Sequence, residues 1–264
     1  MHPIANIAEK AARSAGSIIL KASERMDKVR IIEKGVHDFT TDIDILVENE
    51  IIQQIHVAYP DHKILGEENG ECGGSNEESL WIIDPIDGTT NFIHGLPHYA
   101  VSIAYQYRGK IEHGVIFDPI RDELFSASRG RGAKLNNTRL RVSECQRLEF
   151  GLIGTGFPVK FVELHALYLS LFSKIFPKTA GMRRAGSAAL DLAYVAAGRL
   201  DGFWEMQLNL WDYAAGILLI KEAGGMVGDF LGSEEYLNSG HIVAGNLKIF
   251  KALLQQISPE IDKA

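Results

Sequence analysis

Two aspartates close a short apolar segment and are the first residues that could support chemistry. Residues 80–83 read Leu-Trp-Ile-Ile, a run of strand length, and Asp84, Pro85 and Asp87 follow it. Pro85 lacks a backbone donor and has a fixed φ, which predicts that the chain leaves the sheet here. Gly88 then permits a tight turn that brings the two carboxylates together. Because Mg²⁺ prefers oxygen ligands, Asp84 and Asp87 could bridge a pair of such ions.

An Asp-Gly pair by itself is more often a surface turn without chemistry. Other acidic residues favour a site. Residues 63–66 form a second short strand, which ends at Glu67 and Glu68. If this strand and residues 80–83 are neighbours in one sheet, Glu67, Asp84 and Asp87 meet at the edge where ligands bind in such sheets.

Two more aspartates are expected in the first turns of helices. Thr41 or Asp42 would cap a helix whose apolar residues continue from Ile45, which places Asp44 in its first turn. Asp212 has the same position before a helix at 213–223. Capping alone would explain both residues, and participation in the acidic site is the alternative.

The remaining pattern predicts an alternation of helices and strands. Helical spacing indicates helices at 3–26 and 163–176, and a third helix, rich in small residues, that is opened by 183–190 and runs through Ala197. Strands are expected at 99–107, 111–117, 122–128, 150–157 and 202–206. Loops are expected at 69–79 and 129–133. The three consecutive strands predict an antiparallel meander. No linker divides the chain, so we expect one domain over 1–264, with an α+β half at about 1–145 and an α/β half at about 146–264 that are not independent.

Composition narrows the class of protein. The chain has 264 residues and is 46% hydrophobic, which is enough for a large core. Its 27 basic and 34 acidic residues give a net charge of −7, which argues against a general nucleic-acid or membrane-surface binder. We expect no membrane partner and no direct sequence-specific contact with nucleic acid. Cys72 and Cys145 show no disulfide or zinc spacing. With no signal peptide or membrane-spanning run, we expect a cytoplasmic protein.

Three motifs occur in a fixed order: Glu67-Glu68, the segment Asp84-Pro-Ile-Asp-Gly-Thr89, and the segment Trp211-Asp-Tyr-Ala-Ala-Gly216. Together they resemble the inositol monophosphatase family over nearly the full chain, and its bacterial SuhB-type members most closely. The resemblance implies an α+β fold, the layered αβαβα sandwich shared with fructose-bisphosphatases. It also implies a homodimer that hydrolyses a phosphate monoester, inositol 1-phosphate, in a Mg²⁺-dependent and lithium-sensitive reaction.

The same resemblance assigns roles to individual residues. It implies Glu67, Asp84 and the carbonyl of Ile86 at one metal ion, and Asp84, Asp87 and Asp212 at a second. Asp44, Thr89 and Glu67 would orient the attacking water. The implied substrate contacts are Asp87, Gly88, Thr89, Ala188, Glu205 and Asp212, with the Gly88 and Thr89 amides on the phosphate. The role of Lys34 stays open.

Three alternatives remain. The protein could be a phosphatase with dual specificity for sugar or nucleotide substrates. It could be a transcription antitermination factor that contacts NusA-type factors and RNA polymerase, with catalysis secondary; Arg183 and Arg184 would then lie at a dimer or partner surface, unless they are ordinary exposed arginines. A calcium-binding structural module is a third class, but the chain lacks the DxDxDG loop such modules use.

Overall fold

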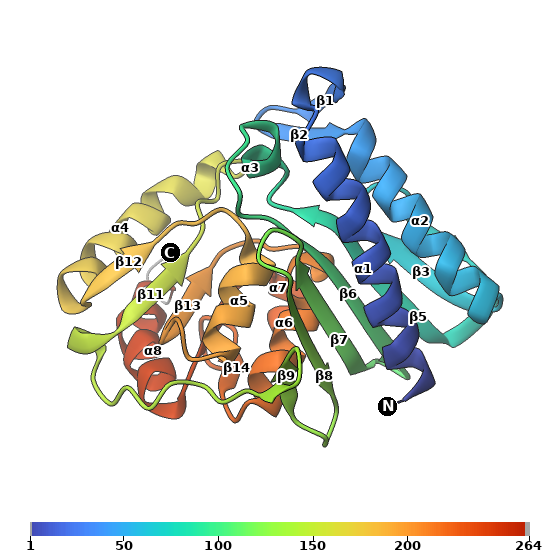
Figure 1. The fold of residues 1–264 in the computed structure, drawn as a ribbon. Helices are drawn as coiled ribbons and strands as arrows, with labels where there is room; N and C mark the ends of the chain where they lie inside the picture. Colours follow the sequence, from blue (N-terminus) through green and yellow to red (C-terminus); the bar gives the residue numbers. More distant parts are fainter. Residues whose placement is uncertain (1, 262–264) are drawn as a thin grey trace.

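Helices and sheets alternate in five layers in the computed structural model, which describes residues 2–261 (Figure 1). Two helices, α1 (Pro3–Ser23) and α2 (Asp42–Ala58), cover the outer face of an eight-stranded sheet. A second pair, α5 (Ala188–Ala196) and α6 (Leu210–Glu222), lies between this sheet and a five-stranded one. A third pair, α4 (His165–Ile175) and α8 (Leu247–Ile261), closes the far side. This arrangement confirms the predicted αβαβα sandwich.

The larger sheet carries the predicted meander. Its order is β10-β9-β8-β7-β6-β5-β3-β4. The strands are β3 (His62–Gly66), β4 (Gly70–Gly73), β5 (Asn76–Asp87), β6 (Ala100–Tyr107), β7 (Lys110–Asp118), β8 (Glu123–Ser128), β9 (Ala133–Leu135) and β10 (Thr138–Arg139). Neighbouring strands are antiparallel except β3 and β5, which run parallel with Leu65 opposite Ile82. The two strands that deliver acidic residues are therefore neighbours.

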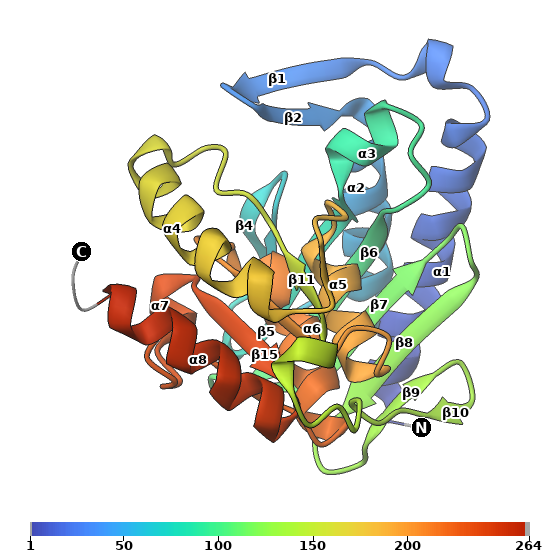
Figure 2. The ribbon, with the colours of Figure 1, turned by 90° about the vertical axis from the view of Figure 1, so that its left-hand side faces the viewer.

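The smaller sheet has the order β12-β11-β13-β15-β14. It consists of β11 (Leu152–Thr155), β12 (Gly181–Arg183), β13 (Gly202–Glu205), β14 (Met226–Gly228) and β15 (Ile242–Gly245). A hairpin of β1 (Ile31–Gly35) and β2 (Asp38–Thr41) stands apart from both sheets (Figure 2). The short helices are α3 (Thr89–Ile93), α7 (Tyr236–Ser239) and four 3₁₀ segments, Met26–Lys28, Leu148–Phe150, Val162–Leu164 and Phe176–Lys178. No helix within residues 2–261 is long and apolar enough to cross a membrane.

Strand alternation sends side chains into separate hydrophobic cores. On β5, Trp81 packs toward α1 and α2, whereas Ile82 faces the middle helices. On β13, Phe203 faces the middle helices and Trp204 packs toward α4 and α8. α5 and α6 contact strands of both sheets. That the halves at about 1–145 and 146–264 form one domain stays a prediction.

The prediction that the chain leaves the sheet at Pro85 was wrong. β5 continues to Asp87, and its pairing with β6 shifts between Asp84 and Asp87, which oppose Ser102 and Ala100. A bulge tolerates a residue without an N–H donor, so the proline is accommodated inside the strand. The extra residue still brings both aspartates to the strand end.

Two other boundaries also differ from expectation. The segment 69–79, expected to be a loop, contains β4 and the start of β5, where Cys72 pairs with Ile64. Its polar composition concealed a half-exposed edge strand. The helix expected to open at 183–190 begins at Ala188, because Ser187 caps it and Arg183 belongs to β12. The strands β14 and β15 and the helix α8 had no predicted counterpart.

Core packing of the middle layer sets a first test. Leu192 on α5 is fully buried between the two sheets, whereas Leu46 on α2 is 51% exposed. Leu192→Ala should lower the free energy of unfolding by about 2–5 kcal/mol, because it leaves a cavity. Leu46→Ala, as the matched control, should change it by less than about 1 kcal/mol. Urea unfolding measures both; equal losses would contradict this packing.

Candidate active site

The parallel pairing of β3 and β5 brings the first acidic residues together, as the sequence predicted. The Glu67 backbone N–H donates to Ile83 O at 3.2 Å, so the residue after β3 is tied to the strand that carries Asp84. The charge of Glu67 also raises the pKa of Asp84, after burial, so the two carboxyl groups lie close together. Asp84 is buried and Glu67 half-buried. Two carboxyl groups therefore meet at this end of the sheet.

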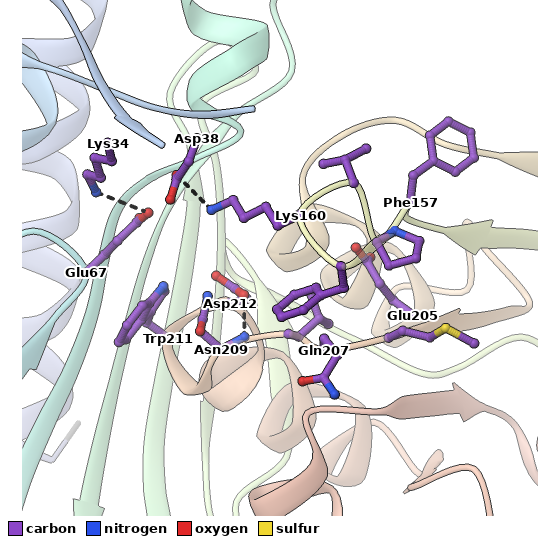
Figure 3. A pocket seen from close by; sticks show the side chains of 15 residues that line it. Lys34, Asp38, Glu67, Phe157, Lys160, Glu205, Gln207, Asn209, Trp211 and Asp212 are labelled. Carbon is purple, nitrogen blue, oxygen red and sulfur yellow. Dashed lines mark hydrogen bonds and ion pairs between the residues drawn. The ribbon is translucent and has the colours of Figure 1, made fainter. Parts of the chain in front are cut away.

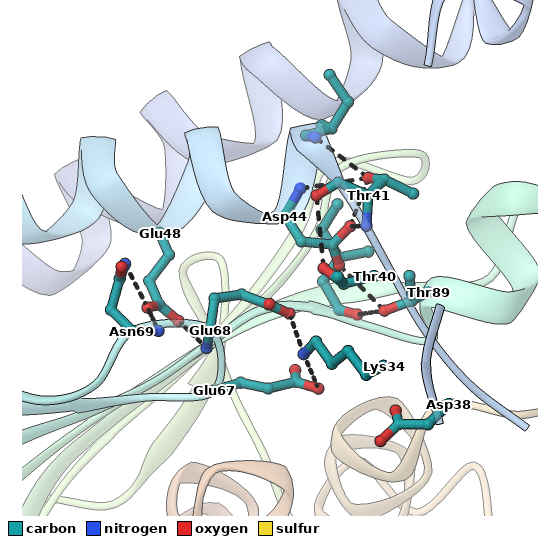
Figure 4. A network of polar contacts seen from close by, with 12 residues as sticks. Lys34, Asp38, Thr40, Thr41, Asp44, Glu48, Glu67, Glu68, Asn69 and Thr89 are labelled. Atoms are coloured by element: carbon teal, nitrogen blue, oxygen red, sulfur yellow. Dashed lines mark hydrogen bonds and ion pairs between the residues drawn. The ribbon is translucent and has the colours of Figure 1, made fainter. Parts of the chain in front are cut away.

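The first turn of α2 adds a third carboxyl group. Thr41 caps the helix, and Asp44 completes the capping box by accepting the Thr41 N–H at 2.8 Å. The other Asp44 oxygen accepts from the Thr89 hydroxyl at 3.0 Å (Figure 4). The Thr89 hydroxyl also lies 3.1 Å from Ile86 O. Capping alone is therefore an incomplete explanation of Asp44, because the same carboxylate links the helix to the turn after β5.

Asp87 connects the larger sheet to the middle helices. Its Oδ2 accepts from Ser187 Oγ at 2.5 Å and from the Ala189 N–H at 2.7 Å, at the start of α5. A helix N-terminus favours a negative charge, so these contacts stabilise the carboxylate. They also bring Ala188 close to the acidic cluster. Gly88 has φ +102°, and a Cβ there would lie 3.1 Å from Gly186 O, so the turn requires glycine.

The C-terminal half contributes Glu205 and Asp212. Asp212 accepts the Asn209 N–H at 2.7 Å in the capping box of α6. A cavity of about 440 Å³ opens beside it (Figure 3) and is lined by Lys34, Asp38, Glu67, residues 157–161, residues 205–209, Trp211 and Asp212. A second cavity of about 150 Å³ shares Glu205, Leu208 and Asp212 with the first and adds Asp87, Thr155, Gly156, Arg184, residues 186–188 and Asp191. Five of the predicted site residues thus line two adjoining cavities: Glu67, Asp87, Ala188, Glu205 and Asp212. Asp44, Gly88 and Thr89 line neither cavity.

Burial raises the pKa of every carboxyl group in this cluster. The pKa of Asp44 rises to about 6 and that of Glu67 to about 7, first through burial and then through neighbouring carboxylates. Burial likewise raises the pKa of Asp87 to about 6, against the hydrogen bonds from α5. Asp84 and Asp212 have pKa values well above the ordinary range for the same reasons. Without a compensating cation, the cluster retains protons.

These residues fit a hard divalent cation in their chemistry. Asp84 Oδ1 is buried and has no hydrogen-bond partner among the described residues, and a buried acceptor of this kind calls for a ligand. The surrounding groups are oxygen donors, as Mg²⁺ prefers. No group of three or more His, Cys, Asp or Glu side chains within residues 2–261 is already arranged around a common metal position. The evidence that these residues suit a divalent cation is therefore their negative charge and the unpaired oxygen of Asp84. It does not include a set of ligands already in coordination geometry.

The structure adds polar residues that the sequence patterns did not assign. Lys34 lies on β1 of the β1–β2 hairpin. Its Nζ is 2.7 Å from Glu68 Oε1 and 3.8 Å from Glu67 Oε1 (Figure 4). Across the larger cavity, Lys160 pairs with Asp38 at 2.7 Å (Figure 3). Only Lys34 had been noticed, with no role. Neither ion pair has a local sequence signal, because each joins residues far apart in the chain.

Two buried acids were also missed. Asp191 is 2% exposed on α5, and burial followed by the charge of Asp87 raises its pKa. Glu48 is fully buried on α2, beside the apolar residues Val47 and Ile51. In both cases an acidic residue stands among the apolar residues of a helix, and this pattern could have indicated a buried acid.

Arg183 and Arg184 are both exposed, and Arg184 borders the acidic cluster, where its charge opposes the rise in the pKa of Glu205 and Asp191. The Arg183 guanidinium donates to the carbonyl of Met182 at 2.9 Å. The guanidinium of Arg184 lies 5.0 Å from the centre of the Phe157 ring, and the residue lines the smaller cavity. A dimer or partner surface at these residues stays a prediction.

A layered sandwich with carboxyl groups gathered at strand and helix ends defines the class of this protein. A model of the inositol monophosphatase family matches residues 1–263, so the chain belongs to that family.

Individual relatives agree. "Nus factor SuhB" of Pseudomonas aeruginosa is 56% identical over 265 residues, which cover 99% of this chain and 98% of the relative. The crystal structure of the extragenic suppressor protein suhB from Bartonella henselae has a TM-score of 0.94 at 42% identity and covers 97% of this chain and 98% of that one. Thermotoga maritima IMPase has a TM-score of 0.87 at 36% identity, with 98% of each chain covered. The expected resemblance is therefore confirmed, including its SuhB-type branch.

The raised pKa values predict how the stability of the metal-free protein depends on pH. A carboxyl group whose pKa is higher in the folded state adds stability that is full below its unfolded pKa and is lost as pH rises through its folded pKa. For Asp44 alone, with a pKa raised from 3.8 to about 6, the loss is about 3 kcal/mol. Urea unfolding with a chelator should therefore show falling stability from pH 4 to pH 8.

Adding Mg²⁺ at pH 8 should restore stability, because the ion binds only the folded cluster. A metal-free protein whose stability is flat or rises over this range would contradict the electrostatic description.

Proposed function

We propose that the protein is a Mg²⁺-dependent phosphate monoester hydrolase that releases phosphate from inositol 1-phosphate. One observation carries this proposal. Carboxyl groups from the end of β3, from β5, from α2 and from α6 gather around Asp84, one buried oxygen of which has no partner among the described residues, and two of them, Glu67 and Asp212, line a cavity. Phosphoryl transfer depends on positioning and on neutralising charge, and clustered carboxylates with divalent cations provide that. The chain needs no nucleophilic serine or cysteine for this chemistry.

The metal-holding residues are assigned in two sets. Glu67, Asp84 and the carbonyl of Ile86 would hold one Mg²⁺ ion, and Asp84, Asp87 and Asp212 a second. When bound, Mg²⁺ supplies positive charge that neutralises phosphate oxygens and makes water a stronger acid. Asp84 lies near both Glu67 and Asp87, since the charges of both raise its pKa after burial, and this supports its assignment to both sets.

The protein groups that handle water lie on the α2 side of the cluster. Thr89 holds a hydrogen bond to Asp44, and Glu67 lies near enough for its pKa to be raised by the charge of Asp44. In this proposal Asp44 keeps the Thr89 hydroxyl oriented, and Thr89 with Glu67 positions the attacking water. The backbone N–H groups of Gly88 and Thr89 would bind the phosphate. The glycine allows the turn that exposes them.

Substrate hydroxyls would occupy the smaller cavity. Ala188, Glu205 and Asp212 line it, and Glu205 has a pKa raised well above the ordinary range, first by burial and then by the charges of Asp191 and Asp87. Carboxyl groups are suitable partners for the hydroxyls of a polyol. Sugar and nucleotide phosphates also carry hydroxyls, so a dual-specificity phosphatase is the alternative within this proposal. We further propose lithium sensitivity, a homodimer and a cytoplasmic location.

A second proposal concerns transcription. The Pseudomonas aeruginosa relative bears the name "Nus factor" at 56% identity over nearly the whole chain. We propose that this protein also acts in transcription antitermination, through contact with a NusA-type factor and RNA polymerase. Arg183 and Arg184 are exposed and remain the candidates for the partner or dimer surface.

Asp87→Asn tests the catalytic proposal. The amide cannot supply the same negative charge, so we expect phosphate release to fall by at least about 100-fold. The assay is phosphate release with and without Mg²⁺ from inositol 1-phosphate, fructose 1,6-bisphosphate, phosphoadenosine phosphate and histidinol phosphate. Asp229→Asn is the matched control. Asp229 is also buried, but it accepts the backbone N–H groups of Leu231 and Ser233, in a turn that belongs to neither set of proposed metal ligands. Wild-type turnover that needs no Mg²⁺, or none at all from folded protein, would contradict the proposal.

The same variant separates the two functions. If antitermination depends on contacts alone, folded Asp87→Asn should still bind a NusA-type factor and support ribosomal RNA transcription in cells, despite losing phosphate release. Pull-down and a terminator read-through assay measure these outcomes. Loss of both activities in a folded variant would show that the regulatory role requires the catalytic site.

A further inference from the structure

Glu48 is a buried acid that none of the roles above uses. It lies on α2, four residues after Asp44, and therefore on the same face of the helix one turn later. Its exposed fraction is 0%. An ionised carboxylate is costly to bury unless its oxygens are paired with donors. Its partners therefore indicate what it does.

Three N–H donors converge on the Glu48 carboxylate, all from the turn after β3 (Figure 4). The Glu68 N–H donates to Oε2 at 3.0 Å. The Asn69 backbone N–H and side-chain Nδ2 donate to Oε1 at 2.8 and 2.9 Å. Both oxygens are engaged, and a carboxylate has enough lone pairs to accept all three bonds.

The same carboxylate also contacts the residue before Glu67. A Cβ added to Gly66 would lie 2.4 Å from Glu48 Cδ and 2.4 Å from Oε1. Gly66 lies in β3, and its φ is outside the left-handed region. Close approach is therefore the reason for glycine here. Glu48 thus contacts the chain on both sides of Glu67, at Gly66 and at residues 68 and 69.

We propose that Glu48 is a positioning residue that fixes the backbone of the Glu67 turn, so that Glu67 faces Asp84 and the metal site. This inference rests on the proposed function, because Glu67 is assigned there as a metal ligand. The Glu67 N–H bond to Ile83 O holds one side of the turn against β5, and Glu48 holds it against α2. α2 then positions two site groups directly, Asp44 through its own side chain and Glu67 through Glu48.

Glu48→Gln tests the proposal with a change of one functional group. The amide keeps one acceptor oxygen but turns an N–H₂ group toward the donors of the turn, so the turn should loosen. We expect the amides of residues 68 and 69 to exchange hydrogen faster in the metal-free protein. We also expect a rise of roughly 10- to 100-fold in the Mn²⁺ dissociation constant and in the half-saturating Mg²⁺ concentration for phosphate release.

Glu50→Gln is the matched control. Glu50 lies on the same helix and also accepts two hydrogen bonds, but from Gln54 and from Ser14 on α1. It should leave amide exchange at 68 and 69 and Mn²⁺ affinity unchanged, even if it lowers stability. If Glu48→Gln changes stability alone, as Glu50→Gln does, Glu48 is merely structural and the proposal fails.

A second variant approaches the contact from the opposite side. In Gly66→Ala the new methyl group overlaps the Glu48 carboxylate, so this variant should weaken Mn²⁺ binding as Glu48→Gln does. In a Glu48→Ala background the space is free, and adding Gly66→Ala should then cause little further loss. Additive losses in the double variant would contradict the proposed contact.

The outcomes also separate this inference from the proposed function. If the wild type hydrolyses phosphate monoesters with Mg²⁺ but Glu48→Gln behaves like Glu50→Gln, only the positioning role fails. If the wild type binds no Mn²⁺ and shows no turnover while Glu48→Gln still speeds exchange at 68 and 69, the role in holding the turn survives and the proposed function fails.

Discussion

The dominant constraint on this structure is the gathering of buried carboxyl groups that repel one another. Asp84 lies at the centre, fully within the protein, and its pKa is raised by burial and by the charges of Glu67, Asp87, Asp212 and Asp44. Such a cluster opposes folding when it is ionised and without a cation. The rest of the fold must therefore hold these groups in place, and the parallel β3–β5 pair and the bulge in β5 supply the framework.

Three helix N-termini stabilise the acidic groups. Asp44 completes the capping box of α2, Asp212 that of α6, and Asp87 accepts hydrogen bonds at the start of α5. Each N-terminus favours a negative charge nearby, which partly offsets the repulsion. The helices come from two different layers, so the packing of the layers is what brings their N-termini to the same acidic cluster. Glu48 extends this arrangement, because it holds the Glu67 turn against α2.

The sequence predicted the acidic cluster better than it predicted the chain path around it. Motif order identified the family, and strand ends rich in carboxylates indicated that Glu67 and Asp84 meet. Pro85 misled because a bulge accommodates it, and bulges depend on the partner strand. The strand β4 was missed because an edge strand with one exposed face has a polar, turn-like composition. Contacts such as Lys160 with Asp38 join distant segments and have no local signal.

Proton release on metal binding tests the central claim most directly. If Mg²⁺ binds carboxyl groups that retain protons near neutral pH, binding must displace those protons. Calorimetric titration of metal-free protein at pH 6 in two buffers with different ionisation enthalpies measures the number released. We predict net release at pH 6 that declines as the pH rises. Binding without proton release at pH 6, or no binding by folded protein, would contradict the account of a protonated carboxyl cluster that Mg²⁺ occupies.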